Sequence, residues 1–180
     1  MTFSRARNLS RFVVAAVATA LTASAMAEQP ATTLATLLDK QAIQDMLVDY
    51  YGQLGSRRSD FGAYYVADGV LDVNGVSGQG EKAIEDLYKK IGAGTPKRTG
   101  IFRMMLTNVK VVVNGDTATA DSLWTGVNSE TLQMVPRFIE QGTEHDELVK
   151  RNGKWLFKHR IISSDGGMQE MFEKTHKPNK

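Results

Sequence analysis

The sequence predicts an α+β domain in which helices pack on one face of a curved antiparallel sheet. Helix-forming segments come first, and strand-forming segments follow almost to the end of the chain. Such segregation of helices from antiparallel strands is typical of α+β folds. Two Asn-Gly pairs, Asn114-Gly115 and Asn152-Gly153, separate strand-like runs. They predict tight hairpins, because a type I′ turn needs positive φ at both central residues.

The helices are predicted from apolar spacing and from glycines that stop them. The longest spans about residues 34–54 and ends at Gly55, and a start signal is expected at Thr36 with Asp39. A short helix is expected at 60–67 and a third at 81–91. The apolar stripe of the long helix consists of Leu37, Leu38, Ile43, Met46, Leu47, Tyr50, Tyr51 and Leu54.

The strands are predicted at 70–73, at 101–113 with 116–128, and in a last hairpin at 140–165. In the first hairpin, the Asn-Gly turn would place Met105 opposite Trp124 and Val111 opposite Ala118 on one mostly apolar face. Residues 28–33 are expected to be a flexible leader and 166–180 a polar tail, so 34–165 is expected to be one domain.

The last hairpin supplies the candidate catalytic residues. A two-residue turn at Asn152-Gly153 places Leu148 opposite Phe157 and Asp146 opposite His159, with Glu144 on the same face. A carboxylate beside an imidazole raises its pKa and fixes its tautomer, so His159 could act as a general acid or base. The alternative is a structural pair at the rim of the sheet, and a β-bulge would break the pairing.

The opposite face of this hairpin is expected to be a solvent or dimer surface. There His145 would face Arg160, and Glu147 would face Lys158. Ligand contacts are expected instead from aromatic and thioether side chains on the apolar face or above it, which suit a hydrophobic molecule. These candidates are Tyr51, Met105, Trp124, Phe138 and Phe157.

Composition excludes several kinds of chemistry. The chain has no Cys, so thiol nucleophiles, Cys-type zinc sites and iron–sulfur clusters are ruled out. The chain has only three His, at positions 145, 159 and 176, so a three-His metal site is not expected. No phosphate-binding loop is present either. We therefore expect no cofactor and no metal.

The first 27 residues are predicted to be a secretory signal peptide. Three Arg precede a short apolar run, and Ala25-Met26-Ala27 fits the cleavage site. We therefore expect a periplasmic or secreted protein without a membrane anchor after cleavage. The segment removed carries three Arg and no acid, so the remaining chain is nearly neutral, which gives no reason to expect nucleic acid as a partner.

Several runs in order along the chain resemble the SnoaL-like branch of the nuclear transport factor 2-like superfamily. They are Gln41–Tyr51, Val66–Val73, Gly80–Ile84, Asn108–Ala120, Glu144–Arg151, Gly153–Trp155 and His159-Arg160. The resemblance implies a cone-shaped sheet around an apolar pocket, about three helices on its concave face, and a homodimer. Dehydratase-type members of the branch carry an Asp where this chain has Gly55, and a His where it has Met104 and Met105.

The function expected from these observations is a small-molecule pocket protein. It would bind a hydrophobic small molecule, with cofactor-independent lyase, isomerase or hydrolase chemistry at Asp146, His159 and Glu144. The alternative is a ligand-binding or protein-interaction module of the same fold without catalysis, which the two departures at Gly55 and Met104 favour. Fold alone does not choose between these alternatives.

Overall fold

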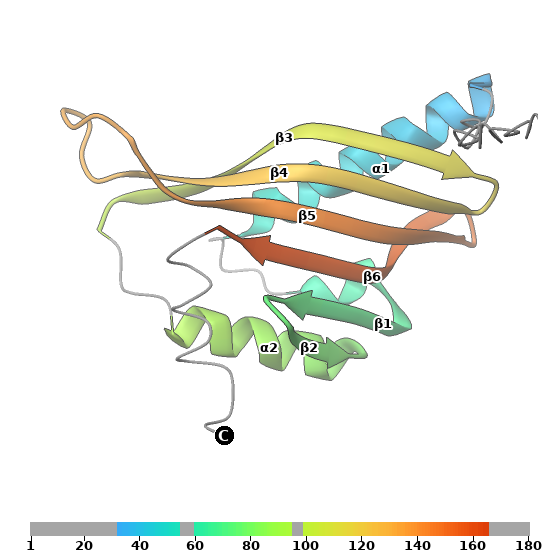
Figure 1. Ribbon diagram of the computed structural model, residues 1–180, viewed down its shortest axis with the longest axis horizontal. Coiled ribbons are helices and arrows are strands. Elements are labelled where there is room, and N and C mark those ends of the chain that lie inside the picture. Colours follow the sequence, from blue (N-terminus) through green and yellow to red (C-terminus); the bar gives the residue numbers. More distant parts are fainter. Residues whose placement is uncertain (1–31, 55–59, 95–98, 166–180) are drawn as a thin grey trace, which may run out of the picture.

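The computed structural model describes residues 32–54, 60–94 and 99–165, and there the α+β class is confirmed (Figure 1). The predicted signal peptide, most of the predicted leader, Gly55 and the polar tail lie outside these residues. The elements are α1 (Leu34–Gln53), the 3₁₀-helix η1 (Phe61–Tyr64), β1 (Tyr65–Val73), β2 (Val76–Gln79), α2 (Glu81–Gly94), β3 (Ile101–Asn114), β4 (Thr117–Ser129), β5 (Arg137–Arg151) and β6 (Lys154–Ser164).

The six strands form one sheet in the order β2-β1-β6-β5-β4-β3. Every neighbouring pair is antiparallel except β1 and β6, which run parallel. The prediction of a wholly antiparallel sheet is therefore wrong at this pair. No hairpin joins β1 to β6, so no tight turn dictates their relative direction. Between Tyr65, which lies beside Phe157, and Val70, which lies beside His159, the ladder shifts register.

The helix count is lower than predicted. The described residues contain two α-helices, and the helix expected at 60–67 is a single 3₁₀ turn followed by β1. Tyr64, Tyr65 and Val66 favour extended structure, and pairing of Tyr65 with Phe157 of β6 satisfies that preference. No helix in the described ranges is long and apolar enough to cross a bilayer.

Helix α1 supplies the side chains that close the core over the sheet. It starts one turn earlier than the expected signal, because Thr33 and Thr36 form a reciprocal capping box. Its buried side chains are Ile43, Leu47, Tyr50 and Tyr51. Leu37 and Leu38 of the predicted stripe are instead 51% and 63% exposed. The apolar stripe therefore covers the sheet only along the second half of the helix.

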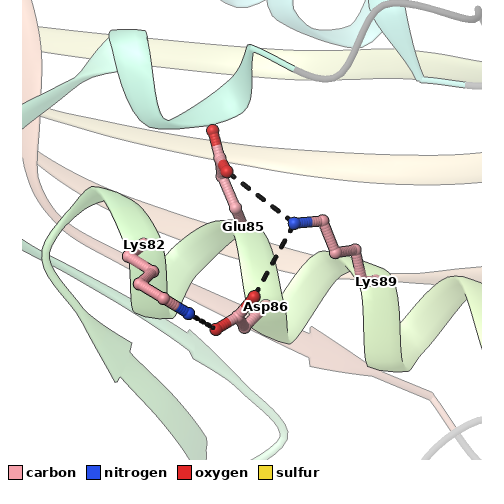
Figure 2. A network of polar contacts seen from close by, with 4 residues as sticks. All are labelled: Lys82, Glu85, Asp86 and Lys89. Atoms are coloured by element: carbon pink, nitrogen blue, oxygen red, sulfur yellow. Dashed lines mark hydrogen bonds and ion pairs between the residues drawn. The ribbon is translucent and has the colours of Figure 1, made fainter.

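Helix α2 packs beside β1, β2 and η1 through Ile84 and Leu87, which are buried (Figure 1). Its outer face carries ion pairs among Lys82, Glu85, Asp86 and Lys89 (Figure 2). These side chains are largely exposed, so the pairs contribute little to stability.

The β3–β4 hairpin differs from its predicted register. Asn114 lies opposite Thr117, and Val111 lies opposite Ala120 rather than Ala118. Asn108 has a φ of 53° within an irregularity between Thr107 and Lys110. An extra residue in a strand moves the following side chains to the other face. Leu106 therefore lies opposite Trp124, and the prediction that Met105 faces Trp124 is wrong.

A polar anchor joins the start of α1 to the β5–β6 hairpin. Lys150 Nζ lies 2.6 Å from Asp39 Oδ1, and Trp155 Nε1 donates to the same oxygen at 3.0 Å. The two donors hold the pKa of the Asp39 carboxyl below its ordinary value of 3.8. The carboxylate thus ties together segments more than one hundred residues apart in sequence.

Asp39→Asn should lower the free energy of unfolding by about 1–2 kcal/mol, because both donors lose their charged acceptor. Urea denaturation at pH 7 measures this. Asp45→Asn is the control, since Asp45 accepts only from Gln41 on the exposed side of α1, and its effect should stay within about 0.5 kcal/mol. A lowered folded-state pKa adds stability above 3.8 that is lost on acidification, so parent and Asp39→Asn should converge below that pH.

Candidate functional site

The turn of the last hairpin forms as predicted. Asn152 and Gly153 have φ values of 51° and 77°, as a type I′ turn requires. Arg151 lies opposite Lys154, and Leu148 lies opposite Phe157, so the predicted register is confirmed up to this point. The turn thereby fixes which side chains of β5 and β6 share the inner face near the hairpin tip.

Beyond Phe157 a β-bulge shifts the register. Glu147 pairs with His159 and Asp146 with Arg160, while Lys158 has no opposite residue of its own. The predicted pairing of Asp146 with His159 is therefore wrong. Because one inserted residue reverses the alternation of a strand, Arg160 points inward and His159 points to the outer face. His159 is half-buried there beside Glu147.

Arg160 is the centre of a buried polar cluster that we call the Arg160 cluster: Arg160, Glu144, Asp146 and Tyr51. The side chains of Arg160, Glu144 and Asp146 are fully buried. The guanidinium forms an ion pair with Glu144 through Nη2, and its Nε lies 3.7 Å from Asp146 Oδ1. The Tyr51 hydroxyl donates a hydrogen bond to Glu144 Oε2. Helix α1 and strands β5 and β6 thus meet at one guanidinium.

Aromatic rings surround the guanidinium of Arg160. Its Cζ lies 3.9 Å from the ring centre of Tyr50, 4.5 Å from that of Phe157 and 5.3 Å from that of Tyr51. Such stacking stabilises a desolvated guanidinium through the electron-rich ring faces. The rings also exclude solvent from the two carboxyl groups, which strengthens every charge interaction among them.

The cluster contains two carboxyl groups for one cation, and this imbalance sets its protonation. Burial raises the pKa of Asp146 well above its ordinary value of 3.8; the Arg160 cation opposes the rise, and the charge of Glu144 adds to it. Burial thus favours the protonated form of Asp146, whereas Glu144 forms the direct ion pair with Arg160. Burial and the charge of Glu144 also raise the pKa of Tyr51, which keeps that hydroxyl a donor.

Several buried polar atoms in and around the Arg160 cluster have no hydrogen-bond partner among the described residues. Ser122 Oγ is one of them, on β4 directly opposite Glu144. Nε and Nη1 of Arg160 are others. A buried polar atom without a partner costs about 1–3 kcal/mol. This concentration of unused donors and acceptors is what a binding site for a polar group requires.

The structure brings together only some of the predicted site residues. Glu144, Asp146, Tyr51 and Phe157 meet at Arg160, and Trp124 lies on the same inner face, where its ring covers Gly142. Met105 and Phe138 are 42% and 72% exposed, so they do not line a pocket with Trp124. That any of these residues contacts a ligand stays a prediction.

Arg160 is the residue that sequence reasoning missed, since it was assigned to the outer face. Two signals pointed to it. Glu144 and Asp146 occupy successive inward positions of β5 and require a cation, and the polar pair Lys158-His159 interrupts the alternation of β6. Among the described residues, no group of three His, Asp or Glu side chains could hold a metal ion.

Two surface clefts lie away from this cluster. One of about 620 Å³ is lined by Asp68, Thr119, Glu147 and Lys158, among others, at the hairpin tips. The other, of about 170 Å³, lies between the start of α1 and β3. Neither is lined by a residue of the Arg160 cluster.

Residues 35–161 match the family model of the SnoaL-like domain. The chain belongs to the SnoaL-like family. The architecture of this SnoaL-like domain agrees, since solved structures with the nuclear transport factor 2-like and cystatin-like fold superpose on most of it. No match was found among curated protein sequences.

Three similar structures illustrate the range of relatives. A cystatin-like protein of unknown function from Nostoc punctiforme is 24% identical, with a TM-score of 0.62 over 72% of this chain and 93% of its own. A nuclear transport factor 2-like protein from Novosphingobium aromaticivorans is 20% identical, with a TM-score of 0.60 over 74% and 86%. ActVI-ORFA from Streptomyces coelicolor is 18% identical, with a TM-score of 0.62 over 72% and 96%. At these identities the SnoaL-like domain shares their fold.

The protonation of Asp146 predicts an unusual pH dependence of stability. A carboxyl with a raised folded-state pKa binds more protons folded than unfolded, so its contribution falls as the pH rises above 3.8. The variant Asp146→Asn carries no charge at this position at any pH. Its free energy of unfolding relative to that of the parent should therefore rise by up to about 1.4 kcal/mol for each pH unit. Urea denaturation at pH 5 and pH 8 measures the difference. Asp39→Asn is the control: because the folded-state pKa of Asp39 lies below 3.8, its gap to the parent should be the same at pH 5 and pH 8. A constant gap for Asp146→Asn would contradict the assignment.

Proposed function

We propose that this SnoaL-like protein binds a hydrophobic small molecule and performs cofactor-independent acid–base chemistry on it, outside the cytoplasm. The observation that carries the proposal is the pair of buried carboxyl groups at Arg160: Glu144 in direct ion pair with the guanidinium, and Asp146 3.7 Å from Nε with its pKa raised by burial. In enzymes, two neighbouring titratable groups whose environments push their pKa values apart commonly serve as the general acid and the general base. The predicted role of His159 is not retained, because His159 lies on the outer face opposite Glu147.

The roles follow from the geometry of the Arg160 cluster. Asp146, as the acid, would donate a hydrogen bond to a ligand carbonyl oxygen, and Glu144, as the base, would accept a proton from the adjacent carbon. Tyr51 and Arg160 hold the Glu144 carboxylate in place, through its two oxygens. Transfer of the carbon-bound proton to Glu144 and of the Asp146 proton to the carbonyl oxygen forms an enol, and the reverse transfers return the ketone and both starting protonation states. Lyase and isomerase reactions share this step, and it needs no cofactor.

Proton exchange tests the proposal directly. The methyl protons of 2-acetylnaphthalene, a hydrophobic ketone, should exchange with D₂O in the presence of the protein, as followed by proton NMR. Glu144→Gln should slow the catalysed exchange by about 100-fold or more, because the base is removed. Glu147→Gln, on the outer face of the same strand, is the matched control and should match the parent.

A module without catalysis is the second candidate, and one observation favours it. Arg160, Glu144 and Asp146 are buried, and neither of the two surface clefts described above is lined by them. Binding of 2-acetylnaphthalene without exchange would support a ligand-binding module. No binding and no exchange would leave protein interaction as the function.

We also propose a homodimer through the outer face of the sheet. Met105, Leu123 and Phe138 are exposed there, opposite Thr125, Thr143 and Val127 respectively. Exposed apolar side chains gathered on one sheet face are typical of protein interfaces. Sedimentation equilibrium should therefore find a dimer for the parent, and Phe138→Asp should shift it towards monomer. Leu38→Asp, on the exposed side of α1, should leave the dimer intact, and a monomeric parent would contradict the proposal.

A further inference from the structure

The charge balance of the Arg160 cluster bears on which ligands it can accept. Among the described residues, Glu144, Asp146 and Arg160 are the only buried side chains of the Asp, Glu, Lys, Arg and His types. The interior therefore holds two acidic groups and a single cation. Glu144 already neutralises that cation through a direct ion pair, and Asp146 lies within 3.7 Å of it.

A ligand carboxylate would bring a third acidic group to one guanidinium. With the pair of Glu144 and Arg160 neutral, the new charge would lie in a desolvated interior with no cation of its own. Other cations, such as Lys150 and Lys158, lie at the hairpin tip or on the outer face. Like charges placed together in a buried site are the usual means by which a protein rejects a wrong ligand.

The hydrogen-bonding groups of the site favour a neutral acceptor instead. Arg160 Nη1 and Ser122 Oγ are buried donors without a hydrogen-bond partner among the described residues, and Arg160 Nε has only the longer contact of 3.7 Å with Asp146. Asp146, when it holds a proton, is a further donor. A carbonyl, ether or ring-nitrogen acceptor could satisfy such donors without adding charge.

We propose that the juxtaposition of two buried carboxyl groups with one guanidinium makes the site selective for neutral hydrogen-bond acceptors and closed to carboxylates. The inference rests on the proposed function, since it concerns the ligand of the same site. It adds a criterion for ligand selection that does not follow from the fold: the ligand must be uncharged, or a proton must bind together with it.

A matched pair of probes tests this selection. 2-Acetylnaphthalene and 2-naphthoate have nearly the same shape and differ in a methyl group against a carboxylate oxygen. Isothermal titration at pH 8 should find the ketone bound about 100-fold more tightly or better. Between pH 8 and pH 5 the naphthoate affinity should rise about tenfold per pH unit, because one proton must accompany it. The ketone affinity should change little.

The possible failures are distinguishable. Naphthoate binding as tightly as the ketone at pH 8 would overturn the selection rule and leave the proposed function standing. Binding of neither probe would overturn both.

Removing the two acidic groups should reverse the preference. In the double variant Glu144→Gln/Asp146→Asn, Arg160 has no counter-ion, so naphthoate should bind at least tenfold more tightly than 2-acetylnaphthalene and raise the melting temperature. The control Asp121→Asn/Glu147→Gln removes two outer-face carboxyls and should keep the parent preference. If the double variant folds only in the presence of a ligand, its refolding should succeed with naphthoate and fail with the ketone. The inference would be overturned by an unchanged ligand preference, or by refolding in the presence of the ketone.

Discussion

The ion pair between Arg160 and Glu144 is the interaction on which the interior of this domain depends. It joins β5 to β6 at the centre of the sheet, and the hydrogen bond from Tyr51 extends it to α1. Removing one partner of such a buried pair costs about 3–5 kcal/mol, since the other charge is left without a counter-ion. A single guanidinium therefore helps to hold the β5–β6 hairpin and the helix α1, which is far from it in sequence, in one arrangement.

The bulge at Lys158 is what makes that ion pair available. Without the extra residue, alternation would place Arg160 on the outer face with Lys158, and His159 on the inner face opposite Asp146. With it, Arg160 enters between Tyr50 and Phe157, whose rings replace part of its hydration. A local irregularity of one strand thus converts a surface cation into the centre of the core. Bulges near functional sites in sheets have this effect of redirecting a side chain.

Family membership establishes the fold of the domain but does not identify a reaction. The SnoaL-like match covers residues 35–161, and the similar structures share the fold at 18–24% identity. Because one fold hosts many functions, any activity has to be inferred from the residues of the site. Here the site departs from the expected histidine chemistry and presents a carboxyl pair tuned by one arginine.

Local chemistry in the sequence alone determined the α+β class, the long helix with Tyr50 and Tyr51 inward, and the Asn152-Gly153 turn with its register as far as Phe157. These features depend on periodicity and on turn residues that act over a few positions. Only the tertiary structure decided the parallel pairing of β1 with β6, the outward position of Met105 and the inward position of Arg160. Each of these depends on contacts between distant strands or on a bulge of one residue. Such an insertion leaves little trace in composition, yet it reverses the face of every side chain that follows.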